Sequence, residues 1–138
     1  MAKHKEHSLQ TPVTEKSICS LMGLSMRQGA VESGSFLAEK SIKGGTARLV
    51  VIAEDASDNT KKDFTDMCNY YHVPYAVFGT KDTLGHAIGK EFRVVMALTN
   101  PGLAEKISEQ IKILLENRIK DGAGLLNPLS YYLVKVGI

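Results

Sequence analysis

The segment from Ala47 to Lys62, ARLVVIAEDASDNTKK, constrains the fold more strongly than any other part of this chain. Its first half holds four consecutive apolar residues, Leu49 to Ile52, most of them β-branched, which is typical of a strand covered on both faces by helices. Its second half is polar and ends in two lysines. Because open α/β sheets place binding groups just beyond the carboxyl ends of their strands, we expect a polar ligand to be met there.

Helical and strand patterns alternate along the rest of the chain. Capping residues indicate helix starts at Thr14, at Ser33 or Gly34, at Ser57 or Asp58, at Thr80 and at Asn100. Strands are expected at residues 49–52, 75–78 and 93–98. Strands that alternate with helices form layers, so the predicted fold class is α/β, a three-layer α/β/α sandwich with a small mixed central sheet.

Apolar residues at helical spacing predict which face of each helix packs on the core. The expected inward-facing residues are Ile18, Leu21, Met22 and Ser25 in the first helix, Phe64, Met67, Cys68 and Tyr71 in the third, Leu84, Ala87 and Ile88 in the fourth, and Leu103, Ile107, Ile111 and Leu114 in the last. The second helix is expected to close at Gly44 and Gly45. Lys40 and Lys43 lie three residues apart in it and therefore share one face.

The length and composition fit one globular domain with short extensions. The chain has 138 residues, of which 43% are hydrophobic, enough for a core of ordinary size. We expect residues 1–12 to be a flexible leader, residues 13–121 the domain and residues 122–138 an apolar C-terminal tail. The tail holds more large apolar residues than a solvated terminus exposes, so we expect it to dock on the domain, on a second copy or on another protein.

Composition also bounds the setting in which this protein works. The net charge of +2 is too small to identify a nucleic-acid partner by itself. No apolar run resembles a signal peptide or a membrane span, so we expect a soluble cytoplasmic protein without a membrane partner. Cys19 and Cys68 both fall on helical stripes, which favours packed, reduced thiols over a disulfide or a metal pair.

Candidate catalytic residues do not assemble in this sequence. Glu54 and Asp55 are adjacent, so on a strand they point to opposite faces and cannot form a carboxylate pair. His72 and His86 stand alone near helix ends, without the oriented partner that general acid–base catalysis needs. Cys68 lies on an apolar stripe, where burial raises a thiol pKa. We therefore predict a protein that is not an enzyme and has no cofactor and no metal site.

Several helix starts and loops are expected to converge on one edge of the sheet. They are residues 34–40, 59–62, 80–81 and 90–94. Helix N-termini present free backbone N–H groups to phosphates, and lysines add a salt-sensitive attraction. From the residues alone, Lys61, Lys62 and Lys81 are explained equally well as solvated helix starts or as contacts to an RNA backbone.

Four blocks of the sequence together resemble a known family. They are GSFLAEKSIKGG, ARLVVIAEDAS, NTKKDFTDMCNYYHVPY and GTKDTLGHAIGKEFRVVMAL. Their order and content are similar to the kink-turn RNA-binding ribosomal-protein superfamily, of the L-seven-Ae and L-thirty-e type, over residues 15–114. The third block looks most like the bacterial YlxQ branch. The resemblance implies an α/β/α sandwich that binds RNA.

The resemblance also implies a contact surface, which transfers to residues 34–40, to Lys81 and to residues 92–94. The basic helix starts add further candidates to it. The predicted RNA-binding residues are Gly34, Ser35, Phe36, Leu37, Lys40, Lys43, Asn59, Lys61, Lys62, Lys81, Phe92, Arg93 and Val94.

Two of these positions depart from the family pattern. Kink-turn binders carry Asn and Glu after a Gly-Thr pair, whereas Phe36 and Leu37 follow Gly34 and Ser35 here. Phe36 either stacks on an unpaired base or belongs, with Leu37, to the core or to a protein contact. We predict a non-enzymatic protein that binds structured, kink-turn-like RNA, with ribosomal RNA as a partner, and that associates with the ribosome in the bacterial cytoplasm. The alternative is a protein–protein interaction module on the same fold, with weak or unspecific RNA binding.

Overall fold

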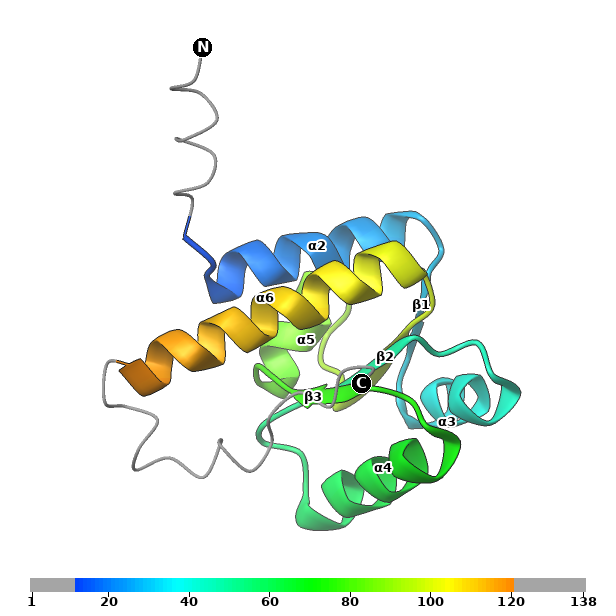
Figure 1. Cartoon of the computed structure of the whole chain (residues 1–138). Coiled ribbons are helices and arrows are strands. Elements are labelled where there is room, and N and C mark those ends of the chain that lie inside the picture. The colour runs from blue at the N-terminus through cyan, green and yellow to red at the C-terminus, as the bar shows by residue number, and fades with distance from the viewer. Residues whose placement is uncertain (1–11, 121–138) are drawn as a thin grey trace.

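The computed structural model describes residues 12–120 and consists of a sheet between two helical layers (Figure 1). Its helices are α2 (Glu15–Arg27), α3 (Ser35–Gly44), α4 (Asp58–Tyr71), α5 (Lys81–Ala87) and α6 (Pro101–Lys120). Its strands are β1 (Val31–Ser33), β2 (Leu49–Ile52), β3 (Tyr75–Val77) and β4 (Val95–Leu98). Helices α3 and α4 cover one face of the sheet, and α2, α5 and α6 cover the other. The predicted three-layer α/β/α sandwich is confirmed.

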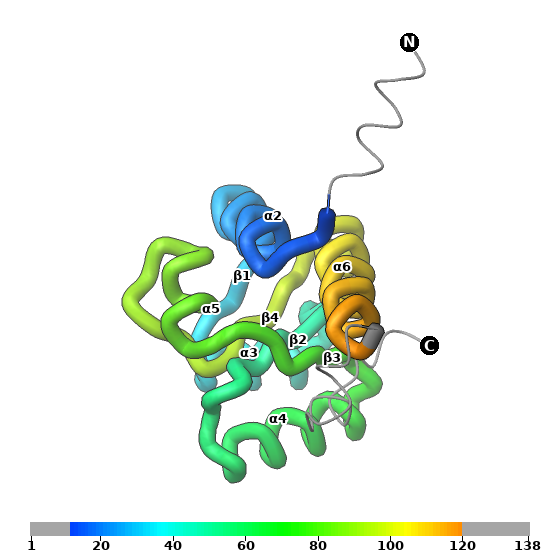
Figure 2. Tube along the Cα trace, turned by 90° about the vertical axis from the view of Figure 1, so that its left-hand side faces the viewer, coloured from blue at the N-terminus to red at the C-terminus, as the bar shows by residue number. Residues whose placement is uncertain are grey.

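The sheet is mixed, as predicted. Its strand order is β1-β4-β2-β3, with β2 and β3 parallel and β4 antiparallel to both of its neighbours. All of β2 and β4 is buried, because both strands lie in the middle of the sheet under helices on each face. Figure 2 shows α2 and α6 side by side above the sheet, with α4 on the opposite side.

Strand β1 is missing from the sequence prediction. It has only three residues, Val31 to Ser33, all half-buried, and just one of them is apolar. Such a segment is too short to carry a periodic signal. Its strand conformation depends on pairing with β4, where Val31 lies opposite Leu98. The two other differences are small: the strands predicted at residues 75–78 and 93–98 are shorter, at 75–77 and 95–98.

The helix starts follow the predicted caps. Thr14 forms a capping box with Ser17, and Ser57 and Thr80 each accept a hydrogen bond from the backbone N–H group three residues later. Asn100 does the same for the start of α6, since its Oδ1 accepts from the Leu103 N–H group at 2.9 Å. These caps satisfy N–H groups that have no partner inside the helix.

Most of the predicted helical stripes pack on the core, with one clear error. Ile18, Met22, Phe64 and Cys68 are buried, but Tyr71 is 40% exposed. Helix α4 ends at Tyr71, and its apolar face no longer covers the sheet there. The assignment of Tyr71 to the core stripe is therefore wrong.

The stripe of α6 is shifted slightly from its prediction. Ile107 and Ile111 are fully buried, whereas Leu103 and Leu114 are only half-buried. Ala104 and Leu115 take the buried positions beside them. The shift is one residue at each end, which is what a 3.6-residue period permits when several neighbouring residues are apolar.

Two of the predicted segments fall wholly or mostly outside the described residues. They are the leader, of which only residue 12 is described, and the C-terminal tail at residues 122–138. Within residues 12–120, none of the helices has the length and apolar character needed to cross a bilayer.

Candidate nucleic-acid interface

One end of the sheet collects three helix starts and the loop that leads into β4. The strand register shows this, with Ser33 opposite Met96, Ile52 opposite Val95 and Ile52 opposite Val77. The carboxyl ends of β1, β2 and β3 thus meet the amino end of β4. We call this end of the sheet, with the starts of α3, α4 and α5 and the loop of residues 90–94, the carboxyl edge.

Hydrogen bonds join the start of α3 to the loop before β4. The Gly34 N–H group donates to the Val95 carbonyl oxygen at 2.9 Å. The Arg93 Nε donates to the Ser33 hydroxyl oxygen at 3.1 Å, and its Nη1 donates to the Phe92 carbonyl oxygen at 2.8 Å. Arg93 therefore uses its guanidinium to fix the loop against β1, which leaves it less able to reach a distant phosphate.

The start of α5 is fixed to the same edge. The Lys81 N–H group donates to Asp55 Oδ1 at 2.9 Å, and the Arg93 N–H group donates to the Lys81 carbonyl oxygen at 3.1 Å. The Glu54 N–H group donates to the Gly79 carbonyl oxygen at 2.7 Å. The Asp55 carboxylate thus has a structural role, because it accepts a hydrogen bond from the first residue of α5.

The first turn of α3 has no side-chain cap. Its N-cap is Gly34, at φ 93°, a backbone conformation that favours glycine, and no acidic residue lies in the first turn. The positive end of the helix dipole and the N–H groups of this turn are therefore not neutralised by a side chain of the helix. Such a turn is suited to an anionic ligand.

Phe36 and Leu37 are not core residues. Phe36 is 77% exposed and Leu37 is 39% exposed, whereas Ala38, the next residue, is fully buried. The core alternative for these two side chains is excluded, and contact with a base or with a protein remains.

The predicted lysines differ in their surroundings. Lys40 is exposed and has no ion pair within the described part of the chain, whereas Lys43 lies 2.6 Å from Glu39. Hydrogen bonding to Glu39 raises the pKa of Lys43. Lys43 also stands at the far end of α3, so the structure does not bring it to the carboxyl edge.

The start of α4 carries the other predicted basic group. Asn59 and Lys62 are exposed and Lys61 is half-buried. The Lys62 ammonium pairs with Asp66 at 2.7 Å, and hydrogen bonding to that carboxylate raises the pKa of Lys62. Asn59, Lys61 and Lys62 thus reach the carboxyl edge, but the charge of Lys62 is compensated within the helix.

The loop before β4 is held close to α5 by a glycine. A Cβ atom on Gly85 would lie 2.5 Å from the Glu91 carbonyl oxygen and 2.5 Å from the Phe92 Cα, so a larger residue cannot fit without displacing the loop. Phe92 itself is 55% exposed, and the Lys81 ammonium lies 5.9 Å from its ring centroid. Val94 is half-buried and packs on the core.

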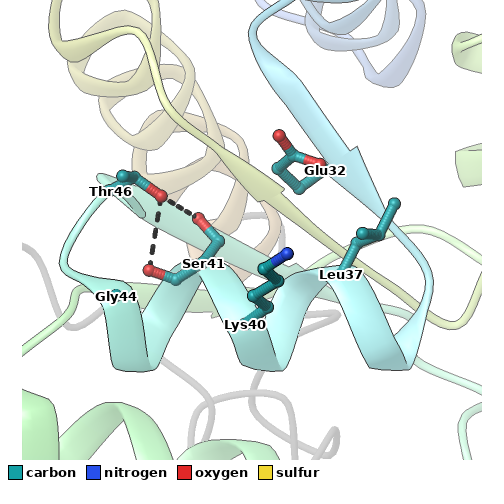
Figure 3. Close-up of a pocket in the computed structure, with 6 residues that line it drawn as sticks. All are labelled: Glu32, Leu37, Lys40, Ser41, Gly44 and Thr46. Carbon is teal, nitrogen blue, oxygen red and sulfur yellow. Dashed lines mark hydrogen bonds between the residues drawn. The ribbon is translucent and has the colours of Figure 1, made fainter.

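A shallow pocket of about 270 Å³ adjoins the exposed face of α3 (Figure 3). The carboxylate of Glu32 and the ammonium of Lys40 lie on its wall, and Leu37 closes one end. The hydroxyls of Ser41 and Thr46 bond to each other at 2.7 Å. The pocket extends the carboxyl edge along α3 with one cation and one anion, which gives it no net charge.

The thiols are not activated. Burial raises the pKa of Cys68 to about 12, and burial together with the nearby Glu15 carboxylate raises that of Cys19 to about 11. Both cysteines are free, and at neutral pH both are protonated and poorly nucleophilic. Within residues 12–120, no three His, Cys, Asp or Glu side chains come close enough to hold a metal ion.

A comparison with models of known protein families gives a match for this chain. The model of the Ribosomal protein L7Ae/L30e/S12e/Gadd45 family matches residues 16–108. The chain belongs to this family. The predicted membership is thereby confirmed, and the matched range contains every residue of the carboxyl edge.

Curated relatives support the bacterial branch. The chain is 49% identical over 87 residues to the RNA-binding protein YlxQ of Bacillus subtilis, a match that covers 63% of this chain and 87% of the relative. It is 30% identical over 113 residues to the large ribosomal subunit protein eL8 of Cenarchaeum symbiosum, covering 80% of this chain and 90% of the relative. The prediction of the YlxQ branch is confirmed by this similarity.

Solved structures share the fold. A Bacillus halodurans protein of unknown function has a TM-score of 0.67 at 35% identity, covering 68% of this chain and 95% of that one. A 15.5kD RNA binding protein from Giardia lamblia has a TM-score of 0.58 at 27% identity, with coverages of 67% and 80%.

Proposed function

We propose that this chain is a non-enzymatic RNA-binding protein that recognises structured, kink-turn-like RNA through its carboxyl edge. The observation that carries the proposal is the junction of the uncapped start of α3, the start of α5 and the Phe92 loop, joined by the hydrogen bonds of Gly34 and Arg93. The names of the YlxQ and Giardia lamblia relatives support RNA as the ligand.

The chemistry of the edge suits an RNA backbone that bends sharply. The N–H groups of the first turn of α3 offer donors to phosphate oxygens, and Lys40 stands one turn further along the same helix. Lys81 supplies a second cation from α5, on the other side of the loop. Two cations and a helix terminus on different elements of one edge can contact the phosphates of two RNA segments that a bend brings together, and such contacts set the orientation of the protein on the RNA.

A titration tests the proposal directly. The full chain is titrated against a labelled kink-turn hairpin and against an unkinked duplex of equal length, each at 50 mM and 200 mM salt. We expect binding to the kink-turn that weakens with salt, because phosphate contacts release counterions. Absence of binding to both RNAs at the lower salt overturns the proposal.

We further propose that this protein works on the ribosome in the bacterial cytoplasm. The similarity to a large ribosomal subunit protein supports this placement. Co-sedimentation of the purified chain with ribosomal subunits tests it, and a chain that stays in the supernatant at low salt contradicts it.

The exposed apolar groups favour a second candidate function, a protein-interaction module. The exposed Phe36 and Phe92 rings belong to the aromatic side chains that are enriched at protein interfaces, and Leu37 adds apolar surface beside Phe36. The domain of residues 13–121 and the apolar tail of residues 122–138 would then act together in self-association or partner binding. Light scattering of the full chain and of a chain ending at residue 121 separates the cases, because an assembling tail gives the full chain a multiple of its monomer mass, whereas the shortened chain then has the mass of a monomer.

A further inference from the structure

Two exposed aromatic rings stand at the carboxyl edge on different elements. Phe36 lies in the first turn of α3 and Phe92 in the loop before β4. Within the described residues neither ring packs against another aromatic ring. Single exposed apolar residues are ordinary, but two large rings with Leu37 at the same edge mark a contact site.

Hydrogen bonds and close packing hold the backbone beside both rings in place. Phe36 follows Gly34, whose N–H group is bonded to Val95, and Phe92 directly precedes Arg93, which is bonded to Ser33. Gly85 allows α5 to touch the backbone at Phe92. The backbone that carries the two rings is therefore preorganised, and a ligand that contacts them does not have to order it.

A cation accompanies each ring. The Lys81 ammonium lies 5.9 Å from the centroid of Phe92, and Lys40 is four residues after Phe36, on the same face of α3. An apolar protein surface that covered these rings would desolvate both ammonium groups without pairing them. An unpaired nucleotide offers a π face for the ring and a phosphate for the cation.

We propose that Phe36 and Phe92 form a stacking platform for unpaired RNA bases, with Lys40 and Lys81 on the adjacent phosphates. This inference rests on the proposed function and names the part of the RNA that is recognised. Asp55 and Glu32 at the same edge lower its net charge, so stacking carries more of the affinity than phosphate contacts do. Binding should consequently depend on salt only weakly, with a slope of about two in log affinity against log salt.

Tryptophan fluorescence reports stacking here without background, because the chain contains no tryptophan. Phe36→Trp and Phe92→Trp are each titrated with a hairpin that has a three-nucleotide bulge and with a fully paired hairpin. We expect emission to be quenched by the bulged hairpin alone. Tyr70→Trp is the matched control, because Tyr70 is an exposed aromatic residue in the last turn of α4, away from the start of that helix, and its emission should not change.

Affinity measurements separate stacking from apolar contact. The double variant with Phe36→Leu and Phe92→Leu keeps apolar side chains without rings, and we expect its affinity for the bulged hairpin to fall by about tenfold or more. The double variant with Phe36→Tyr and Phe92→Tyr keeps both rings and should stay within about threefold of the parent chain. Equal melting temperatures for the variants exclude loss of folding as the cause.

The outcomes distinguish the platform from the proposed function. If RNA binds but the tryptophans are not quenched and the leucine variant binds as the parent does, the platform is overturned while RNA binding stands. If the leucine variant loses RNA binding and the tryptophans are quenched, both stand. If neither hairpin binds the parent chain, both the proposed function and the platform are wrong.

Discussion

Helix α3 and the start of α4 each carry two lysines in the sequence, but these lysines differ in the folded protein. The α3 side, with Lys40 and the Phe92 loop, has a cation without an ion pair in the described residues and exposed rings held by backbone hydrogen bonds. On the α4 side, Lys62 is paired with Asp66 four residues later. An exposed pair of this kind contributes little to stability, yet it compensates the lysine charge that a phosphate would otherwise meet. The comparison teaches that the availability of a lysine depends on its helical neighbours.

The largest effect is expected where the α3 side is assembled. Gly85→Ala removes a glycine from a helix, which by helix propensity alone should stabilise the protein by about 1 kcal/mol. The added Cβ would instead lie 2.5 Å from the backbone of Glu91 and Phe92, so we expect a loss of about 1–3 kcal/mol in unfolding free energy. Chemical denaturation measures it.

Gly44→Ala is the matched control for that change. Gly44 is the last residue of α3, and a Cβ there meets no atom within 4 Å. Its unfolding free energy should change by less than about 1 kcal/mol. A stabilised Gly85→Ala protein would show that the loop is not held against α5 as described.

Charge reversal should act unequally on the two sides. Lys40→Glu with Lys81→Glu should weaken RNA binding by about tenfold to a hundredfold and lower the salt slope by about two units. Lys62→Glu, which changes the same type of residue on the α4 side, should have a clearly smaller effect because Asp66 already compensates that lysine. Fluorescence anisotropy at several salt concentrations measures both. Equal losses of RNA affinity in the Lys40→Glu, Lys81→Glu variant and in the Lys62→Glu variant would contradict the difference between the α3 side and the α4 side.

The buried side of α4 should be sensitive to alkaline pH. The pKa of Cys68 is about 12 in the folded protein, above its ordinary value of 9.0. The unfolded chain therefore releases this proton first, so the stabilisation is complete below pH 9 and is lost as the pH rises toward 12. Between pH 8 and pH 10 we expect a loss of about 1 kcal/mol from this group.

Cys68→Ala isolates that contribution. The variant is less stable at every pH because it leaves a cavity, but its stability should fall less steeply between pH 8 and pH 10. Denaturation curves at the two pH values provide the comparison. If the unfolding free energies of the variant and of the parent chain fell by the same amount between pH 8 and pH 10, Cys68 would be solvated and α4 would not be fixed by its core face.

The smallest expected effect concerns readout on the α3 side. Leu37→Glu introduces one polar residue of the kink-turn pattern and leaves the Phe36 ring in place, and we expect a gain of a few-fold in preference for a kink-turn over a plain duplex, of the order of one hydrogen bond or about 1 kcal/mol. Competition binding with the two RNAs measures the ratio. An unchanged ratio of the two affinities in the Leu37→Glu variant would show that position 37 does not contribute to readout.

The sequence by itself determined the local elements. The apolar run of β2, the caps at Thr14, Ser57 and Thr80, and the glycines that close α3 each act through neighbouring residues, so their effect is visible in one dimension. The family resemblance followed from blocks of the same kind. These signals sufficed to predict the α/β/α sandwich.

Only the tertiary structure decided what lies together and what is free to bind. Strand β1 depends on pairing with β4 and carries no signal of its own in the sequence. The two strands are separated in the sequence by more than half the length of the domain. The exposure of Phe36 and the contact of Gly85 with the Phe92 loop likewise depend on how different segments of the chain pack together. Helix propensity and hydrophobic period act over a few residues, whereas burial and strand pairing depend on the whole packed chain. The sequence alone therefore could not say which of the predicted site residues are exposed and which are buried.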